Sequence, residues 1–106
     1  MTDQEFATLA DAALSDLNRR LSKAADEHDF DPDFRAGTLA VEFEDPPAKF
    51  VVSPNAPVKQ IWVSAHSRSF KLDYDAARSA FVIDGKTLAE MMAEAISKQL
   101  GETVTL

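Results

Sequence analysis

The feature that most constrains the fold is a series of short alternating segments joined by connections of only a few residues. In TLAVEFE, residues 38–44, the apolar Leu39, Val41 and Phe43 occupy every second position, which is typical of a strand with one buried face. Similar segments are DFDPDF at 29–34, KFVVS at 49–53, QIWVSA at 60–65, FKLDY at 70–74 and AFVID at 80–84. A parallel crossover needs about a dozen residues. The spacing therefore predicts a mainly antiparallel sheet of five to six strands.

Turn-forming residues separate these segments. Gly37 precedes TLAVEFE, and the sequence DPP at 45–47 follows it. The pair Asp84-Gly85 predicts another turn late in the chain. We expect the proline-bounded stretch SPNAP, residues 53–57, to be a connection between two strands.

Helical periodicity flanks the alternating region on both sides. From residue 3 to about 25, apolar residues recur at spacings of three and four, and Asp16 precedes Arg20 in the order that favours a helical ion pair. Near the other end, Thr87 and Glu90 are spaced as a capping box, and Gly101 suits a C-terminal cap. The predicted apolar stripes are Phe6, Leu9, Ala13, Leu17, Leu21 and Ala24, then Leu88, Met91, Met92, Ala95, Ile96 and Leu100.

Two helices with one apolar stripe each can cover only one face of a sheet. The predicted fold class is therefore α+β, a two-layer sandwich with both terminal helices on one face of the sheet, in a single domain over residues 1–106. The alternation in QIWVSA places Gln60 and Trp62 on the other, open face. Exposed tryptophan is typical of binding hot spots. A ring that shields the sheet beneath long side chains explains the pattern equally well.

Charge and composition narrow the partners. Asp and Glu outnumber Lys and Arg by 18 to 11, a net charge of −7, which argues against nucleic acid and anionic membranes as partners. Basic proteins and cations are the natural partners, although acidity also serves solubility alone. The chain has no cysteine, no apolar run of the roughly 20 residues that a membrane span needs, and no secretory signal at MTDQEF. We expect a cytoplasmic protein.

The most unusual stretch is ADEHDFDPDF, residues 25–34. Its five carboxylates are Asp26, Glu27, Asp29, Asp31 and Asp33. A calcium EF-hand does not fit, because counting from Asp29 the glycine position holds Phe34 and the twelfth position holds Ala40. Strand residues two apart lie about 6.5 Å from each other, so the carboxylates form a row rather than a cage.

Such a row predicts weak, exposed sites for cations that prefer oxygen ligands. His28 adds a nitrogen ligand suited to iron, zinc or cobalt. A solvated edge with no ligand remains the alternative. No nucleophile, phosphate loop or paired carboxylate centre accompanies His28 or His66, so we expect no enzyme active site. His66 is expected in a solvated loop.

Several stretches together resemble the frataxin family, in particular its bacterial CyaY-type members. EFATLADAAL and LNRRL resemble the first family helix, and the acidic stretch followed by GTLAVEFED resembles the first strand and hairpin. NAPVKQIW, residues 55–62, is similar to the most specific family signature. LAEMMAEAI and LGET resemble the C-terminal helix and its end. The resemblance covers essentially the whole chain.

The resemblance implies a role. Family members are acidic proteins with two helices on an antiparallel sheet, which bind iron weakly and bind the cysteine desulfurase and the iron–sulfur scaffold protein. It implies an acidic ridge (Asp26, Glu27, Asp29, Asp31 and Asp33), with Asp11 and Asp16 upstream on the helix, and a partner contact made by Asn55, Gln60 and Trp62. It also implies a monomer that can form metal-dependent oligomers.

Some positions depart from the family. Late in the first helix, where bacterial members usually carry acids, this chain has Asn18, Arg19, Ser22 and Lys23. Ala7 and Lys59 occupy positions where relatives can carry a histidine ligand. The added positive charge should weaken cation binding on the helix.

Two functions follow as hypotheses. The first is an iron-binding accessory protein of iron–sulfur cluster assembly, which modulates the cysteine desulfurase and delivers iron through the acidic ridge. The alternative is an acidic protein-interaction module whose metal binding is incidental. A weak iron oxidase, as proposed for some relatives, is the least favoured.

Overall fold

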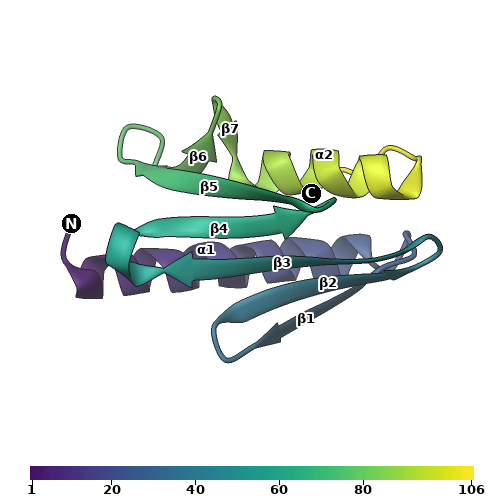
Figure 1. Ribbon diagram of the computed structural model, residues 1–106, viewed down its shortest axis with the longest axis horizontal. Coiled ribbons are helices and arrows are strands. Elements are labelled where there is room, and N and C mark those ends of the chain that lie inside the picture. Colours follow the sequence, from purple (N-terminus) through teal and green to yellow (C-terminus); the bar gives the residue numbers. More distant parts are fainter.

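The computed structural model describes residues 1–106 and has two layers, with both helices on one side of a single sheet (Figure 1). The helices are α1 (Asp3–Ala24) and α2 (Leu88–Leu100), and a 3-10 turn, η1, spans Ala56–Val58. The strands are β1 (Asp31–Arg35), β2 (Thr38–Glu44), β3 (Pro47–Asn55), β4 (Gln60–Ala65), β5 (Arg68–Asp75), β6 (Ala80–Ile83) and β7 (Lys86–Thr87). Neither helix is long and apolar enough to cross a membrane.

The strands follow one another in chain order across the sheet, and every neighbouring pair is antiparallel. This confirms the predicted α+β sandwich. The strand number differs, since the sheet has seven strands and not five to six. The additional strand is β7, which has only two residues and follows the Asp84-Gly85 turn. A two-residue strand leaves no alternation in a sequence.

One apolar core lies between the layers, and none of its 21 buried residues is polar or charged. The inward residues of TLAVEFE, namely Leu39, Val41 and Phe43, are buried as predicted. In α1 the buried stripe passes through Phe6, Ala10, Leu14, Leu17 and Leu21, with the predicted Leu9, Ala13 and Ala24 at its margins. The helix therefore faces the sheet slightly rotated from the expected stripe.

The prediction that SPNAP is a connection was right only for Ala56 and Pro57, which lie in η1. Ser53, Pro54 and Asn55 belong to β3, and only the short turn η1 separates β3 from β4. Pro54 pairs with Ile61 of β4, and the pairing of β3 with β2 ends earlier, at Val52. Since no second strand flanks β3 at Pro54, its missing amide hydrogen costs the sheet little.

The ends of α2 follow the predicted signals. Thr87 and Glu90 form a reciprocal capping box, in which each side chain accepts a hydrogen bond from the other residue's backbone N–H. The hydrogen bond from the Thr87 N–H is the main cause of the lowered pKa of the Glu90 carboxyl. Gly101 ends the helix in the left-handed conformation, with φ of +70°. Local sequence therefore determines where the C-terminal helix begins and ends.

Candidate functional site

The acidic ridge begins in the turn after α1 and continues along β1. All five of its carboxylate residues are exposed, as predicted. Asp26, Glu27 and Asp29 lie in the turn that precedes the strand, so only Asp31 and Asp33 lie on a strand. Phe30 is buried between these two parts, with its ring centroid 6.0 Å from that of Phe43. Burial of Phe30 fixes the acidic ridge to the core.

Most of the ridge is not neutralised within the chain. Asp33 pairs with Arg35 at 3.3 Å, and both side chains are at least half exposed. The other four carboxylates form no ion pair. The ridge therefore presents uncompensated negative charge to solvent.

The register adds a carboxylate that sequence reasoning missed. Glu42 of β2 stands directly opposite Asp31 of β1, and both are exposed. Side chains opposite each other on an antiparallel pair have Cβ atoms about 5 Å apart. The alternation of TLAVEFE placed Glu42 outward, but only the pairing register shows that it faces Asp31. Its nearest cation, the Lys49 Nζ, is 4.0 Å away.

The carboxylates still do not converge on one point. No three or more His, Asp or Glu side chains are grouped closely enough to hold a metal ion. An ion here would be held by one or two carboxylates, with water completing its coordination. Such sites are weak and exchange quickly, and they favour hard cations.

His28, within the acidic stretch, contacts a carboxylate from outside the ridge. Its Nδ1 is 2.5 Å from the Glu102 Oε2, and the side chain is 17% exposed. The contact fastens the turn after α1 to the segment that follows α2. Its role as an iron ligand stays a prediction.

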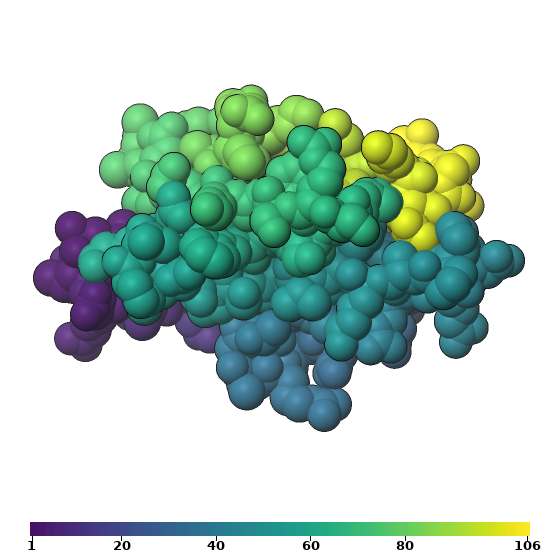
Figure 2. Space-filling model, viewed as in Figure 1, coloured from purple at the N-terminus to yellow at the C-terminus, as the bar shows by residue number.

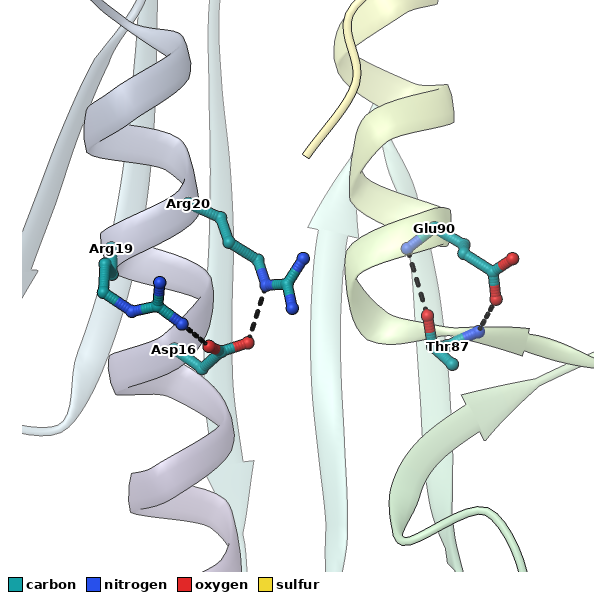
Figure 3. A network of polar contacts seen from close by, with 5 residues as sticks. All are labelled: Asp16, Arg19, Arg20, Thr87 and Glu90. Carbon is teal, nitrogen blue, oxygen red and sulfur yellow. Dashed lines mark hydrogen bonds and ion pairs between the residues drawn. The ribbon is translucent and has the colours of Figure 1, made fainter.

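The helix-side acids differ from the ridge. Asp16 contacts both Arg19 and Arg20, the latter through Nε at 2.7 Å (Figure 3). Hydrogen bonding from Arg20 is the main cause of the lowered pKa of the Asp16 carboxyl, and Arg19 adds to it. Asp11 is exposed on α1 without an ion pair and lines a hollow with Gly37, which follows β1. Asp16 instead lines a hollow with Ala80 of β6, so the two acids lie on different sides of α1.

The structure also shows the surroundings of Ala7 and Lys59, two positions at which this chain departs from the family. The Lys59 Nζ lies 2.9 Å from the Asp3 Oδ1, so this lysine compensates an acid at the start of α1. Ala7 lines a shallow apolar hollow between α1 and the end of β3. Neither position offers a metal ligand in this chain.

The open face of the sheet carries the predicted partner residues. Trp62 is 36% exposed on that face, as predicted, and its Nε1 donates to the Gln60 Oε1 at 2.9 Å. Gln60 in turn donates to the Asp73 Oδ1 at 3.0 Å. The Lys71 Nζ lies 5.0 Å from the centre of the indole ring. The tryptophan is thus partly available and partly covered by a long side chain.

Asn55 belongs to the same group, since it pairs with Gln60 across β3 and β4. Sequence reasoning missed Lys71 and Asp73, although the alternation of FKLDY placed both on the open face. Asp31 and Asp33 also point to that face, because Asp33 stands opposite Ala40, and Ala40 opposite Val51 and then Ser64. The strand part of the ridge and the Trp62 group therefore share one continuous face.

Known proteins resemble this chain over its full length. The frataxin-like domain profile matches residues 1–102. The iron-sulfur cluster assembly protein CyaY of Janthinobacterium sp. (strain Marseille) is 34% identical over 108 residues, which cover 100% of this chain and 96% of that protein. The CyaY protein of Azotobacter vinelandii is 32% identical over 106 residues, which cover 96% of this chain and 92% of that protein.

A solved structure has a similar fold. The frataxin from Psychromonas ingrahamii, described within the CyaY protein family, has a TM-score of 0.84 at 27% sequence identity. The comparison covers 99% of this chain and 97% of that one. On the profile match, the relatives and the shared fold, the chain belongs to the frataxin-like domain family.

Proposed function

We propose that the protein is an iron-binding accessory protein of iron–sulfur cluster assembly, which binds iron weakly on the acidic ridge and modulates a cysteine desulfurase and its scaffold. The printed names of its relatives, iron-sulfur cluster assembly proteins, support the assembly role. The observation that carries the iron-binding part is the exposed ridge with four unpaired carboxylates. Iron is a cargo here and not a resident cofactor.

The chemistry of the ridge suits a cargo that must leave again. Asp31 and Glu42 face each other across two strands, which offers an iron(II) ion two hard oxygen ligands. Both side chains are in water, so little desolvation opposes binding and little protein structure opposes release. We expect dissociation constants no tighter than micromolar.

Docking of the desulfurase would use the same face. A basic patch on that partner would meet Asp31 and Asp33, while Trp62 anchors the contact on the adjoining sheet. The hydrogen bond from Trp62 to Gln60 holds the indole in one orientation, which reduces the entropy lost on binding. Because iron and the partner would share carboxylates, they should compete at high iron concentration.

The experiment measures both activities of one variant. Asp31→Lys with Asp33→Lys is compared with Asp3→Lys and Glu94→Lys, a matched pair with the same change of charge and no ridge residue. Anaerobic iron(II) titrations followed by NMR should perturb residues 26–33 first in the native protein. Desulfurase binding without metal, and desulfurase turnover across iron concentrations, are measured on the same samples.

If the proposal is correct, the ridge variant should lose both iron binding and desulfurase binding, while the control variant keeps both. Signal changes confined to α2 would overturn it. The alternative, an acidic protein-interaction module, is favoured by the absence of converging ligands. That reading expects loss of desulfurase binding with iron affinity unchanged.

A further inference from the structure

A second surface lies toward the opposite edge of the sheet from β1. It is a groove between the first half of β5, the β6–β7 turn and α2. We call it the β5 groove; its volume is 180 Å³. Its apolar floor consists of Phe70, Ile83, Met91 and Ala95. Phe70 is only half buried, so the groove exposes aromatic surface that the core does not use.

The rim of the β5 groove is basic although the chain is acidic. Arg68, Lys86 and Lys98 face two carboxylates, Asp84 and Glu94, within a protein of net charge −7. Lys86 is compensated by Glu94 at 2.5 Å. Arg68 and Lys98 form no ion pair, and the Arg68 guanidinium lies over the Phe70 ring, 5.2 Å from its centre. Two cations of the groove therefore have no carboxylate partner within the chain.

The edge of the sheet is open at the same place. β6 pairs with Asp73–Asp75 only, so residues 68–72 of β5 have a strand neighbour on one side, β4, and none on the other. Figure 1 shows β6 beside only the C-terminal half of β5. No side chain of the protein bonds to the backbone of residues 68–72. Every second residue of an unpaired edge directs its N–H and C=O outward, where another chain can pair with them.

We propose that the β5 groove takes an extended acidic segment of a partner protein, which adds as a strand along residues 68–72. Five residues of added strand span about 16 Å. On the groove side, an apolar side chain would pack on the floor beside Phe70, between two acidic side chains that meet Arg68 and Lys98. Main-chain hydrogen bonds give such a contact its affinity, and alternate side chains give it specificity.

This surface is independent of the acidic ridge. β1 and β5 are separated by three strands in the sheet, so a basic partner on the ridge and an acidic segment in the groove can bind together. The inference goes beyond the proposed function. Asp31→Lys with Asp33→Lys should leave groove binding unchanged, which separates failure of one idea from failure of the other.

The test uses the synthetic peptide Ac-SETVTEG-NH2, whose two glutamates and valine project to the same side of a strand. NMR titration should shift the amides of residues 68–72 and of α2 residues 91–98. Arg68→Glu with Lys98→Glu should weaken binding by about tenfold, as expected for reversing two exposed contacts. Lys23→Glu with Lys49→Glu, the matched control, should not. The charge-reversed peptide Ac-SKTVTKG-NH2 should not bind.

Backbone pairing is tested with two N-methylated forms of the peptide, each methylated at alternate amides in one of the two phases. If the peptide adds as a strand, methylation of one set of alternate amides should abolish binding, and methylation of the other set should leave binding unchanged. Equal binding of both forms, shifts outside the groove, or equal weakening in the control variant would overturn the proposal. So would sedimentation showing that a second copy of the chain occupies this edge without peptide.

Discussion

The acidic ridge and the β5 groove lie on opposite sides of the molecule and have opposite charge. In the space-filling view, the blue atoms of β1 and the β1–β2 turn lie at the lower margin, and the green to yellow atoms of β6, β7 and α2 lie at the upper margin (Figure 2). The ridge presents carboxylates on a segment anchored by buried Phe30. The groove presents cations above half-buried Phe70. The net charge of −7 is a sum over the whole chain and does not show that an acidic and a basic surface are separated in space.

The two regions also differ in how their backbone is protected. β1 is an edge strand with Pro32 as its second residue and aspartates on both sides of that proline, a combination that discourages pairing with another chain. β5 has no proline and leaves part of its outer edge open. The ridge edge therefore offers charged side chains but little backbone for pairing, whereas the edge beside the groove also offers main-chain hydrogen-bonding groups.

The largest expected difference concerns anchoring. Phe30→Ala should lower the free energy of unfolding by about 3 kcal/mol, because it opens a cavity beside Phe43, whereas Phe70→Ala should cost only about 1 kcal/mol at its half-exposed site. Urea unfolding followed by Trp62 fluorescence measures both. Equal losses would mean that the two surfaces are anchored alike.

Substitutions in the ridge should change the affinity for iron, whereas substitutions in the groove should not. Asp31→Asn with Glu42→Gln should weaken iron(II) binding by about tenfold, or roughly 1.4 kcal/mol, since the register sets these two carboxylates opposite each other. Arg68→Gln with Lys98→Gln should leave it unchanged. Anaerobic calorimetry measures both variants. A ridge variant that binds iron normally would place the iron elsewhere.

A smaller gain is expected from restoring an acid on α1. Lys23→Glu replaces a cation one turn before the ridge, and should strengthen iron(II) binding by about threefold through the changed Coulomb interaction. Lys98→Glu at the end of α2 makes the same change of charge and is the control. The difference between them should shrink in high salt. Equal effects of both variants would indicate a response to net charge only.

The smallest effect concerns Asp16, whose pKa is lowered in the folded protein mainly by Arg20. Its stabilising contribution is present above the ordinary carboxyl pKa of 3.8 and is lost as the pH falls through the lower folded value. Because these side chains are about two-fifths exposed, Asp16→Asn should cost no more than about 0.5 kcal/mol at pH 7 and nothing in strong acid. Urea unfolding at both pH values tests this. A loss that persists in acid would point to the helix and not to the ion pair.

Periodicity in the sequence predicted most of the fold. Helical stripes, the Thr87–Glu90 box and the turns at Gly37 and Asp84-Gly85 are local signals, and the structure confirms them. β7 was missed because two residues show no periodicity. Pro54 was misread because a proline is tolerated in a strand when no neighbour needs its amide, and the neighbours of a strand are not a local property.

The candidate sites were likewise predicted from the sequence only in part. Composition and alternation by themselves determined that the five carboxylates between residues 26 and 33 are exposed and that Trp62 lies on the open face. Only the tertiary structure decided that Glu42 faces Asp31, that His28 turns to Glu102, and that β6 leaves half of β5 unpaired. The physical reason is that side-chain direction follows from the local backbone period, whereas strand register and edge coverage depend on contacts between residues far apart in the chain.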